Sequence, residues 1–235
     1  MIEERFERTA MLLGNKAVKH LQNAHVAVVG LGGVGSYAAE ALIRAGIGEL
    51  TLVDCDTVSV TNINRQLCAL TSTVGERKTQ VTAHRAADIN PEAVLHPLEL
   101  FYTPDTREIL FARHYDYVID AIDTVSAKTD LICTAIERGI PIVSALGTGN
   151  KLHAEQLQFA DIYQTSVCPL ARAMRRELRR HGVTAHTVLY STEKPQGTTE
   201  NEHGRHYPGS VAWVPGCAGL MLAGYVVMAL SGIPD

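Results

Sequence analysis

A glycine-rich stretch near the amino terminus has the spacing of a phosphate-binding turn. The segment "HVAVVGLGGVGSYAAEALIRAG" covers residues 25–46 and places Gly30, Gly32 and Gly35 in the pattern G-x-G-x-x-G. Glycines allow a tight turn from a strand into a helix, and they let a phosphate approach backbone N–H groups at the helix N-terminus. NAD, FAD and ATP are all bound by such turns, and some glycine turns only pack a helix. The pattern alone therefore does not choose a ligand.

Charged and polar residues downstream separate these ligands. Seven of them follow predicted strands or open the next helix: Asp54, Asp56, Asn62, Arg65, Gln66, Lys78 and Asp123. In a doubly wound sheet, such positions converge on one crevice outside the carboxyl ends of the strands. A triphosphate needs cations beside its phosphates and a carboxylate for Mg²⁺, whereas a redox dinucleotide needs neither. These residue types therefore favour ATP over NAD. Asp56 either contacts the nucleotide or caps the following turn, and Asp120 is expected to point away from the crevice.

Strands and helices alternate strictly up to Gly147. The expected strands are 26–30, 49–54, 93–101, 115–123 and 141–146, and the expected helices are 33–45, 75–90, 103–113 and 126–139. This alternation predicts a Rossmann-like α/β fold with a doubly wound, mostly parallel sheet covered on both faces. We expect one domain over residues 1–235, with a helical arm at 1–24 and a nucleotide-binding core at 25–165.

An additional strand–helix extension is expected over residues 166–235. It follows a predicted strand at 154–162 and holds a basic helix and a strand at 186–191. Residues 192–210 carry almost no apolar side chains, which predicts a mobile loop.

The uncharged stretch at residues 211–230 is interrupted by Pro215 and Gly216, which are expected to break it. The remaining helix of about 15 residues is short for a bilayer, which needs roughly 20. We therefore expect a buried packing helix.

Composition narrows the setting of the protein. The net charge is −4, so nucleic-acid binding requires a local basic patch. The five cysteines are scattered without a C-x-x-C pair, so neither a zinc site nor a disulfide framework is expected. These features, with an amino terminus that lacks an apolar signal core, predict a cytoplasmic protein. Cys168 precedes a helix and is expected to be an inert thiol, and Cys217 to serve packing.

The predicted basic helix supplies a local patch. Its arginines recur at three- and four-residue spacing: Arg172, Arg175, Arg176, Arg179 and Arg180. They occupy an arc of about 140° on a helical wheel, with Met174 and Leu178 opposite. The stripe fits the phosphates of an RNA, and its alternative is a solvated helix face beside Glu177.

Several motifs in order resemble one family. "RFERT", "GLGGVGS", "VDCDTVSVTNINRQ", "GERK" and "AIDTVSAK" resemble the nucleotide-binding domain of the ubiquitin-activating-like superfamily of ThiF, MoeB and HesA over residues 5–165. "DIYQTSVCPLARAMRRELRRHGV", "YSTEKP" and "PGSVAWVPGCAGLMLAGYVV" are similar to its tRNA threonylcarbamoyladenosine dehydratase branch. The likeness then covers nearly the whole chain.

The resemblance implies a role for each matching position. ATP is expected around Gly30, Gly32, Gly33 and Gly35, with ribose at Asp54, phosphates at Asn62, Arg65 and Lys78, and Mg²⁺ at Asp123. Arg8 matches an arginine finger donated across a homodimer interface, and with Arg65, Lys78 and Asp123 it forms the expected catalytic set.

The implied reaction is adenylation. The carboxylate of threonylcarbamoyladenosine in tRNA attacks the α-phosphate, and ring closure within the substituent then expels AMP. The alternative from the same superfamily is adenylation of the C-terminal glycine of a ubiquitin-like sulfur carrier, and a sulfur-relay protein stays open as a partner. A plain NAD-dependent oxidoreductase is disfavoured by Arg65, Lys78 and Asp123.

Overall fold

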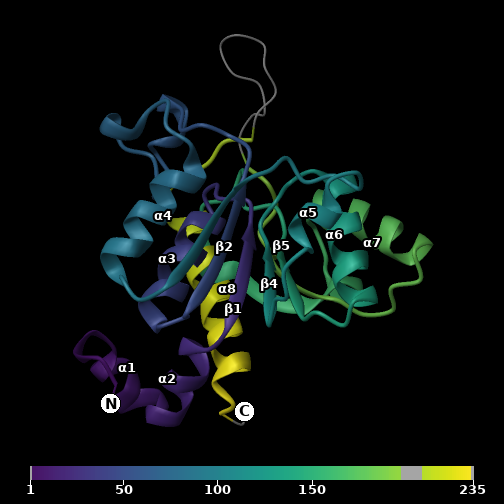
Figure 1. The fold of residues 1–235 in the computed structure, drawn as a ribbon. Helices are drawn as coiled ribbons and strands as arrows, with labels where there is room; N and C mark the ends of the chain where they lie inside the picture. Colours follow the sequence, from purple (N-terminus) through teal and green to yellow (C-terminus); the bar gives the residue numbers. More distant parts are fainter. Residues whose placement is uncertain (1, 197–207, 234–235) are drawn as a thin grey trace.

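The computed structural model describes residues 2–196 and 208–233. One seven-stranded sheet in the order β3-β2-β1-β4-β5-β7-β6 forms its centre (Figure 1). The strands are β1 His25–Val29, β2 Glu49–Asp54, β3 Val94–Glu99, β4 Tyr117–Asp120, β5 Ile142–Ala145, β6 Leu157–Asp161 and β7 Thr187–Ser191. All neighbouring strands are parallel except β6, which runs antiparallel to β7.

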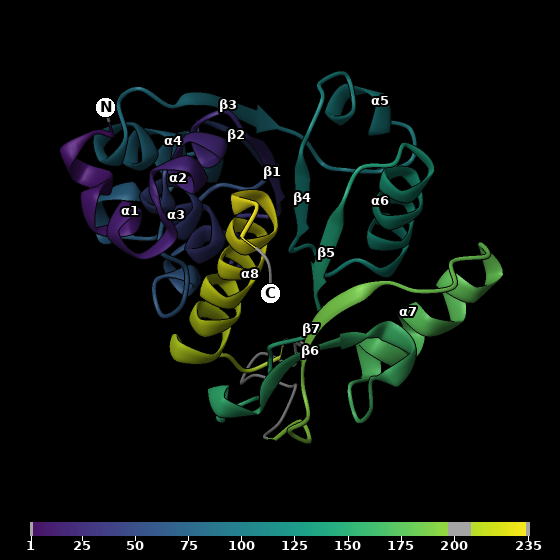
Figure 2. The same ribbon diagram turned by 90° about the horizontal axis from the view of Figure 1, so that it is seen from below.

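Helices cover both faces of this sheet (Figures 1 and 2). They are α1 Glu7–Leu13, α2 Asn15–Gln22, α3 Gly35–Ala45, α4 Lys78–Ile89, α5 Arg107–Leu110, α6 Val125–Glu137, α7 Pro169–Arg180 and α8 Trp213–Ser231. Helices α3, α4 and α8 form a core with one face, and α5, α6 and α7 form a second core with the other. The predicted doubly wound α/β fold is confirmed, because strands buried on both sides need helices on both faces.

The predicted extension belongs to the same sheet. Strand β7 lies between β5 and β6, and α8 returns across the sheet to pack against α3. A Cβ on Gly219 would lie 2.3 Å from the carbonyl oxygen of Val34, so only glycine permits this close approach. Residues 166–235 therefore complete the fold rather than append to it.

Helix α8 corrects one expectation and confirms another. Pro215 and Gly216 do not break the apolar stretch, because both lie in the first turn of α8, where proline removes no helical hydrogen bond. The resulting 19-residue helix is long and apolar enough to cross a membrane by length and composition. Over half of its most apolar window, 56%, is buried inside the protein, in keeping with the expected packing helix.

The segment predicted as a loop at 192–210 is anchored at both ends. Residues 197–207 lie outside the described part of the chain. Glu193 is buried and accepts hydrogen bonds from the amides of Leu152 and His153. The Gln196 amide donates to the carbonyl of Asn150, and Asn150 exchanges hydrogen bonds with Gly209. Backbone partners therefore hold both ends of the predicted loop despite their polar composition, and its mobility stays a prediction.

Candidate functional site

The glycine loop joins β1 to α3 at the sheet's switch point, where β1 lies beside β4. Gly30 has φ +93°, and a Cβ there would lie 2.8 Å from the carbonyl oxygen of Ala121, which follows β4. A Cβ on Gly35 would strike the carbonyl of Gly30 at 1.7 Å. Gly32 instead faces open space, with Gln66 Nε2 as the nearest atom at 3.8 Å from a Cβ. Gly33 is closed off on one side, since a Cβ there would lie 3.1 Å from Pro215 of α8.

The amides of this loop are available to a ligand. Among hydrogen bonds between described residues, none uses the N–H groups of Gly32 or Gly33, while the Leu31 amide donates to Asp54 Oδ2 at 2.8 Å. Unpaired amides at a helix N-terminus form an anion site. The loop therefore has the geometry of a phosphate cradle.

Asp54 and Asp56 converge on one buried lysine. Lys78 opens α4, and its Nζ lies 2.8 Å from Asp56 Oδ2 and 3.8 Å from Asp54 Oδ1. The hydrogen bond from Lys78 holds the pKa of Asp56 below its usual range. Asp54, Cys55 and Asp56 also group ligand atoms within 4.8 Å, but the Lys78 ammonium already pairs with both carboxylates. The predicted union of Asp54, Asp56 and Lys78 is thus observed.

The "NINRQ" segment packs against the glycine loop. The Leu67 amide donates to Ser36 Oγ at 3.1 Å, and Ser36 Oγ donates to the Gly32 carbonyl at 2.7 Å. Arg65 is half-buried, and its Nη1 donates to the Thr61 carbonyl at 2.9 Å. These bonds place the segment beside the cradle.

The side-chain amides of Asn62 and Gln66 in this segment differ in their hydrogen-bond partners. Asn62 Oδ1 accepts from the Ser59 amide at 3.0 Å, so it caps a short 3₁₀ turn, which leaves its Nδ2 for a ligand. Gln66 is only 7% exposed, and its Oε1 has no hydrogen-bond partner among the described residues. Buried amides are normally satisfied, so Gln66 marks an incomplete site. Gln66 is one of the residues expected beyond the carboxyl end of β2, although no role was predicted for it.

Asp123 and Asp120 have opposite environments. Asp123 is exposed in the turn after β4, beyond Ala121 that touches Gly30. Asp120 is fully buried and lies 2.8 Å from Lys128 Nζ of α6. Lys128 also donates to the Ile122 carbonyl at 2.9 Å, next to Asp123 in sequence. Asp120 thus points away from the crevice as expected, and the pair fixes the turn that carries Asp123.

The buried pair continues into a polar chain. Ser144 Oγ donates to Asp120 Oδ2 at 2.6 Å and lies 2.8 Å from His186 Nε2, which donates to it. Burial raises the pKa of Asp120, while Lys128 and Ser144 stabilise its charged form. Sequence reasoning missed Lys128, although it shares a helix face with Leu131 and Ala135, where an apolar residue is expected.

His186 is expected to make the protein less stable in acid. Burial lowers its pKa from 6.5 to about 4. Below about pH 6.5 the His186 imidazole binds a proton in the unfolded chain, but in the folded chain it does so only near pH 4. Up to about 3 kcal/mol of unfolding free energy is therefore lost across this window. Urea unfolding at pH 7 and pH 4.5 should show a smaller loss for His186→Gln than for wild type. Equal losses, with exposed His84→Gln as the control, would contradict the assignment.

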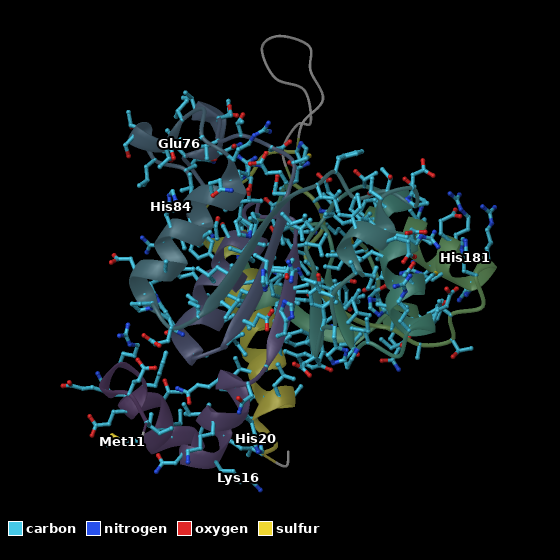
Figure 3. All side chains as sticks on the ribbon, in the orientation of Figure 1. Met11, Lys16, His20, Glu76, His84 and His181 are labelled. Atoms are coloured by element: carbon cyan, nitrogen blue, oxygen red, sulfur yellow. The ribbon has the colours of Figure 1, made fainter. Side chains whose placement is uncertain are left out.

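Arg8 lies far from the glycine loop of its own chain. Helix α1 sits by the amino ends of the strands, whereas the loop follows their carboxyl ends (Figure 1). Arg8 is exposed and lines a groove of about 820 Å³ with Tyr37 of α3 and Leu220 of α8. Nearby, Met11 and Leu12 are 82% and 85% exposed, and Figure 3 shows Met11 pointing outward. The expected role of Arg8 across a dimer interface stays a prediction.

The five arginines of α7 differ in their exposure and in their contacts. Met174 and Leu178 are buried, as expected for the opposite face. Arg175 is half-buried and donates to the Thr165 carbonyl at 2.9 Å, so it is a structural residue rather than part of an open stripe. Arg176 and Arg180 pair with Glu177.

The remaining two arginines, Arg172 and Arg179, are exposed, and Arg179 stacks over the Tyr163 ring at 4.9 Å. The stripe is thus narrower than the sequence analysis expected.

The two cysteines considered in the sequence, Cys168 and Cys217, lie in different environments. Cys168 is buried at the N-cap of α7, next to Val167 with φ +62°. Cys217 is half-buried on α8. Burial lowers the pKa of the nearby Lys151, which donates to the Glu193 carbonyl.

Comparison with known proteins covers nearly the full chain. The ThiF family matches residues 6–235. The tRNA threonylcarbamoyladenosine dehydratase of Bacillus subtilis (strain 168) is 42% identical over 238 residues, or 96% of this chain and 94% of the relative. The structure of E. coli tRNA N6-threonylcarbamoyladenosine dehydratase, TcdA, in complex with ATP is 37% identical, with a TM-score of 0.85 over 97% of each chain. Its complex with AMP is 36% identical, with a TM-score of 0.88 over 97% of each chain. The chain therefore belongs to the ThiF family.

Proposed function

We propose that this protein is an ATP-dependent enzyme that dehydrates N6-threonylcarbamoyladenosine in tRNA. The threonyl carboxylate attacks the α-phosphorus, and the bond from that phosphorus to pyrophosphate breaks. A nucleophile within the same substituent then attacks the acyl carbon, closes a ring and releases AMP, so the nucleoside loses the elements of water. The full-length likeness to the B. subtilis dehydratase carries this proposal, and the open cradle at Gly32 supports it.

The residues of the cradle take separate roles in this reaction. Gly32 and Gly33 amides bind phosphate, and Asp54, held at the end of β2, takes the ribose hydroxyls. Arg65 and Lys78 stabilise the negative charge that develops as pyrophosphate leaves. The unpaired Gln66 amide, 7% exposed and facing Gly32, completes its hydrogen bonds on the bound nucleotide.

Asp123 fits a Mg²⁺ site. It is an exposed carboxylate after β4 with no ion pair among the described residues, and Mg²⁺ is bound by such oxygens together with substrate phosphates. When bound, the ion neutralises charge on the phosphates. Asp123 holds it in place, and Lys128 holds Asp123 through the Ile122 carbonyl.

One assay separates the two adenylation reactions. The protein, ATP and Mg²⁺ are incubated with tRNA carrying the threonylcarbamoyl group, and the digested nucleosides are weighed by mass spectrometry. We expect the modified nucleoside to lose one water as AMP appears. AMP release with a ubiquitin-like sulfur carrier, and no mass loss in tRNA, would overturn the proposal. We also propose a cytoplasmic location, which action on tRNA supports, and a sulfur-relay partner stays a prediction.

Arg8 is proposed to act across a homodimer, and the groove beside it supports this. Neither R8A nor R65A should be active alone. In a mixed dimer, the R8A subunit keeps Arg65 in its own site, and the R65A partner supplies Arg8 to that site. After subunit exchange in an equal mixture, about a quarter of the wild-type rate should return, since half of the dimers hold one complete site. No recovery would show that Arg8 does not act in trans.

Arg172 and Arg179 are proposed to contact tRNA phosphates. Reversing both charges, in R172E/R179E, should weaken tRNA binding and reduce the slope of log affinity against log salt by about 2. The matched control K16E/K19E reverses two exposed lysines on α2, where Figure 3 labels Lys16, far from His181 after α7. An unchanged slope for R172E/R179E would leave α7 as a solvated helix.

A further inference from the structure

Two histidines and a glutamate meet near the amino ends of strands β1, β2 and β3, at the opposite end of these strands from the glycine loop. His25 begins β1, Glu49 begins β2, and His96 lies in β3. His25 is the register partner of Glu49, and His96 is the partner of Thr51, two residues further along β2. Because side chains alternate along strands, all three project from the same face.

The ligand atoms of this cluster have the spacing of a metal site. His25 Nδ1 lies 3.3 Å and His96 Nε2 lies 2.6 Å from Glu49 Oε1, and all three atoms fall within 4.8 Å of one another. Ligands about 2.0 Å from a tetrahedral Zn²⁺ lie about 3.3 Å apart. Small rotations of Glu49 and His96, both half-buried, therefore bring the set to ligand geometry.

The surroundings of His25 orient it as a ligand. Its second ring nitrogen, Nε2, lies 2.8 Å from Thr51 Oγ1, which leaves Nδ1 toward Glu49. Metal-binding histidines have such an acceptor on their other nitrogen. Tyr115 packs edge-on against the ring at 4.7 Å, which holds the ring in this orientation.

A hollow gives access to the cluster. It has a volume of about 570 Å³ and is lined by Thr51 and His96, with Arg113 on its wall. Arg113 opposes a cation, while Glu49 and Asp116 carry the compensating charges near His25. The hollow reaches the cluster at His96, so solvent can approach this ligand.

We propose that His25, Glu49 and His96 bind one divalent transition-metal ion, with Zn²⁺ as the best match for two imidazoles and a carboxylate. The ion ties β1, β2 and β3 together at their amino ends. The sequence analysis expected no zinc because it relied on C-x-x-C pairs, and these ligands are brought together only by strand register.

The test uses the full chain, stripped with a chelator, and Zn²⁺ alone as the probe. All proteins carry Cys55→Ser, because Asp54, Cys55 and Asp56 also lie within ligand distance of one another. Calorimetry should find one Zn²⁺ per chain, weakened at least about 10-fold by His96→Ala and by Glu49→Gln. The control His84→Ala removes an exposed histidine of α4 (Figure 3) and should bind like the parent.

A second measurement guards against misfolding. Zn²⁺ should raise the thermal midpoint of the parent and of His84→Ala, and should not raise that of His96→Ala. Equal urea midpoints without metal would show that His96→Ala is folded. Absence of saturable Zn²⁺ binding, or equal binding by His96→Ala and His84→Ala, would overturn the proposal and leave a proton-linked ion pair.

Discussion

Replacing Arg65 by alanine is expected to lower AMP release by about 10²–10³-fold, the usual effect of removing one group that stabilises transition-state charge. Its guanidinium contacts only the half-exposed 61–65 turn, so the midpoint of urea unfolding should not change. Arg65→Lys should recover little, because an ammonium lacks the planar fork with which a guanidinium binds two phosphate oxygens. The loss should appear in kcat as well as in kcat/KM, since the charge develops in the transition state.

The control for Arg65 is Arg138→Ala. Arg138 is also a partly exposed arginine, but it pairs with Glu108 and covers the Phe111 ring. It should leave AMP release unchanged. Asp123→Asn should match the loss of Arg65→Ala, and rising Mg²⁺ should restore part of its rate. Wild-type turnover in either Arg65→Ala or Asp123→Asn would contradict the proposed site.

Replacing Lys128 by methionine is expected to cost about 3–5 kcal/mol of unfolding free energy, because Asp120 then stays buried without its cation. Both side chains are fully buried, and their atoms lie 2.8 Å apart. Activity should fall as well, since the Ile122 carbonyl beside Asp123 loses its donor. Urea unfolding at pH 7 measures the first effect, and AMP release in dilute urea-free buffer measures the second.

The double variant K128M/D120N provides the sharper comparison. Asparagine Oδ1 still accepts from the Ile122 amide and its Nδ2 donates to Ser144 Oγ, but the side chain carries no charge, so most of the lost stability should return. Lys16→Met, at an exposed position, should stay within about 0.5 kcal/mol of wild type. A double variant as unstable as K128M would mean that the buried charge is not the cause.

The fold was predictable because strands of the core are short apolar runs separated by helical segments. The boundaries of α8 were not, because Pro215 breaks a helix only beyond the first turn, and the sequence does not reveal where the turn begins. Similarly, five arginines at helical spacing predict a stripe. Only the packed structure shows that Arg175 is committed to Thr165.

The site was predictable where the chain itself holds the residues together. Asp54 and Asp56 lie two residues apart, and Lys78 opens the helix that follows their loop. His25, Glu49 and His96 lie on three different strands, so their meeting depends on register, which cannot be read from local spacing. Lys128 was hidden for another reason, since a lone lysine on an apolar helix face is identified only with its buried partner.

Asn150 is expected to make the chain tolerant of changes in length between Gln196 and Gly209. It has φ +57° and forms hydrogen bonds with both Gln196 and Gly209, so one residue holds both ends of the segment between them. Doubling the length of a chain segment whose ends are already held costs only about 0.6 kcal/mol in closure entropy. Insertions between Gln196 and Gly209 are therefore expected to leave β7 and α8 in place.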